Sequence, residues 1–345
     1  MSPAREDESS DVAHPRATTV FYGHAEAERT LLDAYRSGRI PHAWLIGGER
    51  CIGKATLAFR TARFVLTHPD PAALAVQKAT SLAVPADHPV VRRIAVEGHS
   101  ALLDLHRVIN EKTGKLFTEI RVDEIRKTVP FFGLAAGEGG WRVAIIDPME
   151  ETNRSGDNAL LKVLEEPPPR ALLLLVSHAP ARVIPTIRSR CRTLLLRPLA
   201  ADDVARAVAN ALDRKPDDPE IRAAAEAADG SVGRALLMLD GDALELRQQV
   251  LALLERLPQT DPRELHALGD ELSGTEPETL AAFMDAVNGW LSTRLGDGKD
   301  DTARLARIAA AFEQINEAAR AANEYNLDRK PLVFSVFGAL AEAVR

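Results

Sequence analysis

The stretch Ala43-Trp-Leu-Ile-Gly-Gly-Glu-Arg-Cys-Ile-Gly-Lys-Ala-Thr56 decides the fold of this chain. Its first four residues are apolar and predict a buried strand, and residues 55–66 predict a helix. Between them, the phosphate-binding pattern G-x-x-x-x-G-K-[ST] fits from Gly48 through Gly53 and Lys54. Strand, glycine-rich loop and helix in this order predict a P-loop that cradles phosphate at the start of the helix. The alternative interpretation is a glycine-rich turn with an incidental lysine.

The last position of the pattern departs from the rule, because Ala55 stands where a Ser or Thr hydroxyl normally ligates Mg²⁺. Thr56 does not replace that hydroxyl, since one step along a helix turns a side chain by about 100°. We therefore expect a site that holds a nucleotide without hydrolysing it efficiently. Its candidate nucleotide-binding residues in the loop are Gly48, Gly53, Lys54 and Thr56.

The composition indicates a globular protein with two or three domains in its 345 residues, with 46% apolar and 27% charged residues. Residues 1–18 are polar and contain proline, and we expect a disordered leader without the apolar core of a signal peptide. The two cysteines, Cys51 and Cys191, are too few for a disulfide framework or a four-cysteine zinc site. They fit reduced thiols in the cytoplasm.

The charge balance argues against a protein that binds nucleic acid by itself. The net charge is −7, and aromatic residues make up only 5% of the chain. Autonomous nucleic-acid binders usually carry a strongly basic domain, and single-strand binders use aromatic stacking. Any contact with DNA is therefore expected to be local or shared with partner subunits.

The pattern along the chain predicts an α/β domain at residues 19–198 with a mostly parallel sheet, followed by two all-α domains. The first of these is small and spans residues 199–240, and the second spans residues 241–345. Within the α/β domain, helices are expected at residues 25–37, 120–132 and 158–166, strands at 43–46, 141–147, 171–177 and 193–196, and an irregular segment at 68–98. In the last domain, the apolar faces of residues 244–257 and 332–344 predict either partner contacts or core packing.

A second motif lies at the end of the strand predicted for residues 141–147. Asp147 stands where a P-loop hydrolase carries the aspartate of its metal shell. Active enzymes follow this aspartate with a glutamate that polarises water, but here Pro148 follows. Glu150 and Glu151 are expected to be carried out of line with that water. A solvated acid at a strand end is the alternative interpretation of Asp147.

The segment Pro185-Thr-Ile-Arg-Ser-Arg-Cys191 contains two arginines on either side of a serine. Arginine suits phosphate recognition, because its planar guanidinium is permanently charged and can bridge two oxygens. Two ordinary surface arginines are the simpler interpretation when the segment is considered alone.

Together these segments resemble the AAA+ clamp-loader subunits of DNA replication, with an AAA+ P-loop domain, a helical lid and a C-terminal helical collar. The resemblance covers roughly residues 20–240. It rests on Arg39-Ile-Pro-His-Ala43, Asn158-Ala-Leu-Leu-Lys-Val-Leu-Glu-Glu-Pro-Pro168, Pro185-Thr-Ile-Arg-Ser-Arg-Cys191 and Gly230-Ser-Val-Gly-Arg-Ala-Leu236. The degenerate loop and the Gly-x-Arg form of the last segment are similar to the delta-prime family of bacterial DNA polymerase III.

This resemblance implies that Arg190 is an arginine finger, lent to the ATP site of an adjacent subunit. It places Ser177 at the sensor 1 position and Arg234 at the sensor 2 position, both conditional on a bound nucleotide. ATP or ADP is possible at the P-loop, but no cofactor is required. Many relatives carry a four-cysteine zinc module between the P-loop and Asp147. Residues 67–119 contain no cysteine, so zinc is not expected.

The implied function is that of a largely non-hydrolysing subunit in the loader that places the sliding clamp on primed DNA. The implied partners are ATPase subunits of the gamma/tau type, the delta subunit, the sliding clamp and, through the complex, primer-template DNA. The chain would then belong to the DNA polymerase III holoenzyme, which is a DNA-directed DNA polymerase by assembly. The alternatives are a self-sufficient AAA+ ATPase or DNA-remodelling motor, and a protein that binds nucleic acid by itself.

Overall fold

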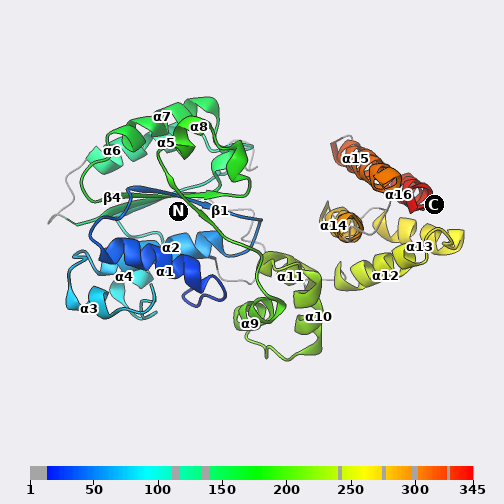
Figure 1. Ribbon diagram of the computed structural model, residues 1–345, viewed down its shortest axis with the longest axis horizontal. Helices are drawn as coiled ribbons and strands as arrows, with labels where there is room; N and C mark the ends of the chain where they lie inside the picture. Colours follow the sequence, from blue (N-terminus) through cyan, green and yellow to red (C-terminus); the bar gives the residue numbers. More distant parts are fainter. Residues whose placement is uncertain are drawn as a thin grey trace. The chain divides into compact units, whose positions relative to one another are not determined.

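The computed structural model describes residues 14–110, 117–133, 140–239, 243–273, 277–296, 302–324 and 327–344. Its contacts divide the chain into two compact units, Met1–Leu236 and Leu237–Arg345, which we call the first and the second unit (Figure 1). The predicted leader lies outside the described residues as far as residue 13. The domain boundaries expected near residues 198 and 240 remain predictions.

The first unit contains a five-stranded sheet with the strand order β2-β3-β4-β1-β5, in which every pairing is parallel. Since parallel strands end at the same edge, Gly47 of β1 lies opposite Ser177 of β4, and Asp147 follows β3 at that edge. The order of the strands reverses around β1, which is where open α/β sheets bind ligands. The strands are β1 Ala43–Gly47, β2 Leu102–Leu105, β3 Arg142–Ile146, β4 Ala171–Ser177 and β5 Arg192–Leu195.

Helices cover both faces of this sheet, with α1 to α4 on one face and α5 to α8 on the other (Figure 1). Successive side chains of a strand point to opposite faces, so Trp44 and Ile46 join the core on one side while Leu45 joins the core on the other. Burial on both faces explains the uninterrupted apolar run of β1. The helices are α1 Ala25–Arg36, α2 Lys54–Thr67, α3 Leu74–Lys78, α4 Pro89–Ala95, α5 Val122–Arg126, α6 Thr128–Gly133, α7 Arg154–Glu165 and α8 Pro185–Arg188.

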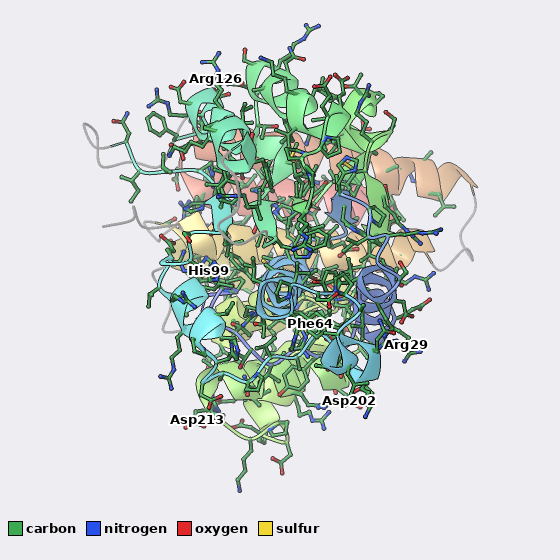
Figure 2. All side chains as sticks on the ribbon, turned by 90° about the vertical axis from the view of Figure 1, so that its left-hand side faces the viewer. Arg29, Phe64, His99, Arg126, Asp202 and Asp213 are labelled. Atoms are coloured by element: carbon green, nitrogen blue, oxygen red, sulfur yellow. The ribbon has the colours of Figure 1, made fainter. Side chains whose placement is uncertain are left out.

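Side chains divide between the interior and the surface of the first unit as their polarity requires. Figure 2 shows the charged groups of Arg29 and Arg126 at the surface, whereas Phe64 of α2 lies inside and is 2% exposed. The predicted fold class is confirmed, because a parallel sheet between helical layers is followed by helices alone.

The segment predicted to be irregular, residues 68–98, contains the two short helices α3 and α4. Helix α4 starts where His88 accepts a hydrogen bond from the Val90 amide and Pro89 takes the first helical position. The helix predicted at residues 120–132 is divided into α5 and α6. Strand β2 is missing from the prediction, since four residues at a sheet edge give too short a hydrophobic pattern.

Three further helices follow the sheet, and the first unit ends at Leu236 within the last of them: α9 Ala201–Leu212, α10 Pro219–Ala227 and α11 Val232–Leu239. The turn before α11 needs glycine at position 230, where φ is +80°. A Cβ at that position would lie 2.5 Å from the backbone nitrogen of Leu199. This close approach fixes the start of α11 against the chain that leaves the sheet.

The second unit is entirely helical in its described residues. Its helices are α12 Ala243–Glu255, α13 Pro262–Leu272, α14 Pro277–Gly296, α15 Thr302–Glu324 and α16 Arg329–Val344. The apolar residues of α12 and α16, among them Val250 and Phe337, lie in one buried cluster, so core packing is the role that the structure gives to these faces. None of the helices described in the chain is long and apolar enough to span a membrane.

Candidate functional site

The P-loop connects β1 to α2 with a backbone that only glycine tolerates at Gly48. This residue has a φ of +147°, and a Cβ there would lie 2.6 Å from the carbonyl oxygen of Leu196. Gly53 has a φ of +96° and directly precedes α2. The first turn of α2 carries backbone N–H groups without helical partners, and these favour an anion. The loop therefore retains the backbone features of a phosphate cradle.

The loop is held in place through its own carbonyl groups, because those of residues 49–52 all accept hydrogen bonds. Lys54 Nζ donates to the carbonyl of residue 49. Ser231 Oγ donates to residue 50 at 3.2 Å, and the amide of Val232 donates to residue 51 at 3.0 Å. The Nε2 of His24 lies 2.7 Å from the carbonyl oxygen of residue 52. The segment before α1 and the start of α11 therefore both fix the shape of the loop.

Lys54 is 3% exposed at the start of α2. Burial lowers its pKa to about 8, although the negative charges of Asp147 and Glu150 act in the opposite direction. Its neighbours Ala55 and Thr56 are half-buried in the first turn of the helix. Ala55 has no oxygen atom in its side chain, so this donor set does not fit the Mg²⁺ site of a P-loop hydrolase.

Asp147 lies directly after β3, at the sheet edge where the sequence pattern places it. Its amide donates a hydrogen bond to the carbonyl of Leu105 at 3.0 Å, and its carboxylate interacts electrostatically with Lys54. The next residue, Pro148, supplies no carboxylate. The structure thus brings Asp147 and Lys54 close enough for their charges to interact.

Glu150 is a site residue whose contacts the sequence does not reveal. Ser177 is completely buried at the end of β4, and its hydroxyl donates to Glu150 Oε1. The same oxygen accepts the amide of Ala179 at 2.6 Å. Although burial raises it, these hydrogen bonds hold the pKa of Glu150 below its ordinary value. Glu151 points elsewhere and pairs with Arg107 at 2.7 Å.

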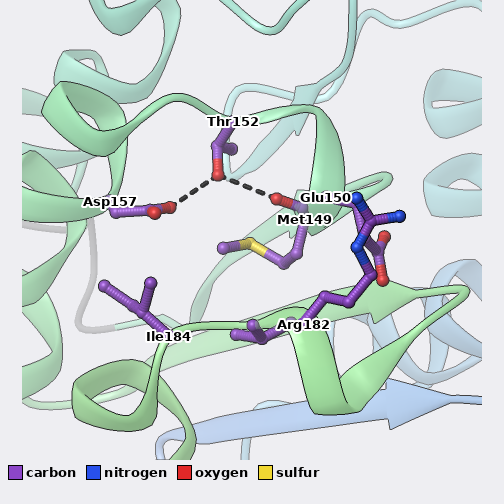
Figure 3. A pocket seen from close by; sticks show the side chains of 7 residues that line it. Met149, Glu150, Thr152, Asp157, Arg182 and Ile184 are labelled. Atoms are coloured by element: carbon purple, nitrogen blue, oxygen red, sulfur yellow. Dashed lines mark hydrogen bonds between the residues drawn. The ribbon is translucent and has the colours of Figure 1, made fainter.

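A cavity of about 150 Å³ adjoins Glu150 and is drawn in Figure 3. The hydroxyl of Thr152 lies between Asp157, 2.6 Å away, and the carbonyl of Met149, 2.8 Å away. Burial raises the pKa of Asp157, and the hydrogen bond from Thr152 opposes that shift. Arg182 also lines the cavity, so both signs of charge border it.

His178 follows Ser177 and was not anticipated from the sequence. Burial lowers its pKa to about 4, and the positive charges of Lys54 and Arg50 add to the shift. The imidazole is therefore neutral at pH 7 and adds no charge beside the P-loop. A histidine after a strand end carries no sequence signal that would distinguish this position from a surface one.

Arg190 lies just beyond α8, in the serine–arginine–cysteine segment. Its guanidinium donates to the carbonyl of Thr186 at 2.9 Å and forms an ion pair with Glu165 of α7 at 2.8 Å. The side chain is 35% exposed. Arg188 is also exposed, with one long hydrogen bond of 3.4 Å to the carbonyl of Ala181. Cys191 is half-buried, and burial raises the pKa of its thiol to about 12.

Arg234, expected at the sensor 2 position, lies in the first turn of α11. It forms an ion pair with Asp229 at 3.1 Å, and its amide donates to Ser231 Oγ at 3.3 Å. Ser231 therefore contacts both the helix that carries Arg234 and the P-loop. Its role could not be read from the sequence, because the P-loop carbonyl that it contacts lies 181 residues away.

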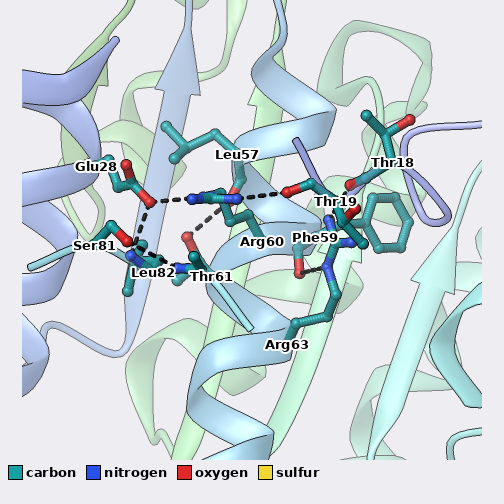
Figure 4. A network of polar contacts seen from close by, with 11 residues as sticks. Thr18, Thr19, Glu28, Leu57, Phe59, Arg60, Thr61, Arg63, Ser81 and Leu82 are labelled. Carbon is teal, nitrogen blue, oxygen red and sulfur yellow. Dashed lines mark hydrogen bonds and ion pairs between the residues drawn. The ribbon is translucent and has the colours of Figure 1, made fainter. Parts of the chain in front are cut away.

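Buried arginines on α2 attach the chain before α1 to the P-loop helix (Figure 4). Arg60 pairs with Glu28 at 2.6 Å and donates to the carbonyl of Thr19 at 2.7 Å. Arg63 donates to the carbonyl of Thr18 at 2.6 Å, so the last residue of the predicted leader is held against α2. Within the described ranges, no group of three or more His, Cys, Asp or Glu side chains is arranged to hold a metal ion.

Relatives among known proteins include subunits of DNA polymerase III. The chain is 38% identical over 152 residues to the DNA polymerase III subunit delta′ of Pseudomonas aeruginosa, a match that covers 44% of this chain and 41% of the relative. It is 28% identical over 262 residues to the Escherichia coli subunit delta′, with 74% and 73% covered. The chain thus spans less than two thirds of the Pseudomonas relative and more than two thirds of the E. coli relative.

A DNA polymerase III gamma subunit-related protein of Thermotoga maritima aligns with a TM-score of 0.48 and 16% identity, over 92% of this chain and 100% of that chain. The RuvB Holliday junction branch migration motor of T. maritima aligns with a TM-score of 0.44 and 14% identity, over 87% and 86%.

A family model described as DNA polymerase III, delta subunit, matches residues 23–200, just over half of the chain. The matched range contains the P-loop, Asp147, Ser177 and Arg190. The two delta′ relatives agree with this match. The chain therefore belongs to the delta-prime subunit family of DNA polymerase III.

Proposed function

We propose that the chain works in the cytoplasm as the delta-prime subunit of a clamp loader, which places the sliding clamp on primed DNA. In this role it hydrolyses little or no ATP and supplies Arg190 to the ATP site of a neighbouring subunit. A guanidinium supplied in this way stabilises the charge of the phosphoryl-transfer transition state and is worth about 10³–10⁵ in rate.

One observation carries the proposal: an accessible arginine is kept in a domain whose own catalytic positions are altered. Arg190 is 35% exposed, and in the part of the chain that the structure describes its ion pair is with the carboxylate of Glu165. Ala55 and Pro148, in contrast, replace the metal-binding hydroxyl and the water-polarising carboxylate of a P-loop hydrolase. Such a chain would contribute to catalysis at the ATP site of a neighbouring subunit.

The P-loop keeps a binding role in this proposal. Gly48, Gly53 and the first turn of α2 fit phosphate oxygens, and Lys54 would contact them after leaving the carbonyl of residue 49. Thr56, Asp147, Ser177 and Arg234 complete the proposed nucleotide site. We assign ATP or ADP as the ligand, and the proposed role of the chain does not depend on its hydrolysis. No structural zinc is assigned.

The proposed partners are ATPase subunits of the gamma/tau type, the delta subunit and, through the complex, the clamp and primer-template DNA. The relatives named delta′, and a 26% identical E. coli subunit tau that matches 89% of this chain and 48% of its own length, support this choice. Affinity purification of the full chain from its own cells, followed by mass spectrometry, is expected to recover these subunits together. Recovery of the chain without any of them would contradict the assignment.

Hydrolysis by the isolated chain distinguishes the proposal from a self-sufficient ATPase or DNA-remodelling motor. The purified protein is expected to release no phosphate from Mg²⁺-ATP above a protein-free control, with or without primed DNA. The matched variant is Lys54→Ala. Hydrolysis that disappears in this variant would show that the P-loop is catalytic and would overturn the non-hydrolysing role.

A further inference from the structure

The two donors at the carboxyl end of β4 are already satisfied by a carboxylate of the same chain. Ser177 is completely buried, and its hydroxyl donates to Glu150 Oε1. The amide of Ala179 donates to the same oxygen at 2.6 Å. A hydroxyl and an amide that converge on one oxygen form an anion site, and here the anion is a side chain.

Lys54, the cation of the site, also has its partners within the chain. Lys54 Nζ donates to the carbonyl of residue 49 and is attracted by the negative charges of Asp147 and Glu150. Position 150 lies three residues beyond the sheet edge, in the short 3₁₀ helix Met149–Glu151, which turns the carboxylate back towards β4. The adjacent Glu151 pairs with Arg107 instead, so this contact is specific to one of two neighbouring acids.

We propose that Glu150 is an internal substitute for a terminal phosphate, so that the P-loop binds a nucleoside diphosphate in preference to a triphosphate. The inference rests on the proposed nucleotide-binding role of the P-loop and is independent of Arg190. A third phosphate brings further negative charge towards the carboxylate of Glu150, and like charges repel more strongly in a protein site than in bulk water. A terminal phosphate that used Ser177 and the amide of Ala179 would displace Glu150, and the half-buried carboxylate would lose both of its donors.

The test compares mant-ADP and mant-ATP, each with Mg²⁺, by fluorescence titration of the full chain. Wild type is expected to bind mant-ADP at least about tenfold more tightly than mant-ATP, which corresponds to 1.4 kcal/mol. Glu150→Ala is expected to tighten mant-ATP at least about tenfold and mant-ADP less than about twofold. Glu150→Gln removes the charge and keeps an acceptor for Ser177. Its affinity for mant-ATP is expected to lie between those of wild type and Glu150→Ala.

The matched control is Glu151→Gln, which removes a neighbouring charge away from Ser177 and is expected to leave both affinities unchanged. Thermal unfolding of each variant shows that it is folded, and the nearly isosteric Gln variant carries the test if the Ala variant is unstable. Equal tightening of both nucleotides, weaker binding of mant-ATP, or no nucleotide binding by any variant would overturn the inference.

Failure of the proposed function gives a different result. If the isolated chain hydrolyses ATP but Glu150→Ala still tightens mant-ATP selectively, the non-hydrolysing role is wrong and the role of Glu150 stands. If the chain does not hydrolyse ATP and Glu150→Ala changes neither affinity, the role of Glu150 is wrong and the proposed function is unaffected.

Discussion

The P-loop and the segment that carries Arg190 belong to the same unit of the molecule but are held in different ways. The loop is fixed by hydrogen bonds to the carbonyls of residues 49–52, and its Lys54 is 3% exposed. Arg190 is 35% exposed and contacts the carboxylate of Glu165, the carbonyl of Thr186 and, at 3.5 Å, the hydroxyl of Ser189. A half-exposed ion pair of this kind contributes at most about 1 kcal/mol. The loop is built to keep its shape, whereas Arg190 can change partners at little cost.

The largest effect is expected from the buried pair that supports the P-loop helix. In Glu28→Ala, Arg60 loses the carboxylate that lies 2.6 Å from its Nε, and the amide of Leu82 loses an acceptor at 2.8 Å (Figure 4). A buried charge left without its partner costs about 3–5 kcal/mol. Urea denaturation should show this loss in the free energy of unfolding.

The control for this prediction is Asp33→Ala, which removes an exposed ion pair with Arg36 on the same helix α1. Its expected loss is below about 1 kcal/mol. Equal losses in the two variants would mean that the ion pair between Glu28 of α1 and Arg60 does not support the P-loop helix.

Gly48→Ala is the next largest change. The new Cβ would lie 2.6 Å from the carbonyl oxygen of Leu196, at a φ of +147°. Backbone strain and overpacking each cost about 1–3 kcal/mol, so we expect a combined loss of about 2–4 kcal/mol in the free energy of unfolding. Gly38→Ala is the control, because its φ is +70° and nothing lies within 4 Å of its Cβ. A loss in Gly48→Ala no greater than in this control would contradict the tight packing of the loop.

Lys54→Met tests whether the buried charge of Lys54 lowers the free energy of unfolding of the protein. Burial lowers the pKa of Lys54 from 10.5 to about 8, so the folded state disfavours the charged form. Below pH 8 Lys54 is protonated in both the folded and the unfolded state, and the wild type bears the full penalty for burying the charge. Between pH 8 and 10.5 the unfolded state binds more protons than the folded state, so the wild type gains stability as the pH rises. At pH 7 the variant should be more stable by about 1–3 kcal/mol.

The measurement is urea denaturation of both proteins between pH 7 and 10. The advantage of Lys54→Met over wild type should shrink as the pH rises through this window. A difference that does not depend on pH would show that the charge of Lys54 is not disfavoured in the folded state.

The smallest effect on stability is expected in the segment that carries Arg190. Glu165→Gln weakens the ion pair with Arg190, whose partners are 51% and 35% exposed. We expect the free energy of unfolding to change by less than about 0.5 kcal/mol in thermal denaturation. A loss above about 2 kcal/mol would mean that Arg190 is part of the fold and is not available to a neighbouring subunit.

The sequence predicts most of the sheet because apolar runs and glycine-rich turns are local signals. Strand β4 lies at residues 171–177, as predicted, and α2 is within one residue of its predicted bounds at each end. Strand β2 and helix α4 escape prediction, since their hydrophobic patterns are only a few residues long.

The site is predictable where its residues follow a motif and unpredictable where tertiary contacts decide. Lys54 and Asp147 are found together at the edge where their motifs place them. Ser231 contacts the loop across 181 residues of sequence. Glu150 reaches Ser177 only because a 3₁₀ turn redirects it. The hydrophobic pattern of the sequence predicts neither the contact of Ser231 nor that of Glu150.

The central claim, that the chain's catalytic contribution is Arg190 acting at a neighbour's site, is tested most directly by ATP turnover in the reconstituted loader. Arg190→Ala should reduce DNA-stimulated turnover at the adjoining ATP site by about 10³-fold or more, with the complex still assembled in gel filtration. Arg188→Ala, two residues away and also exposed, should leave turnover unchanged. Unchanged turnover in an intact complex that contains Arg190→Ala would contradict the account.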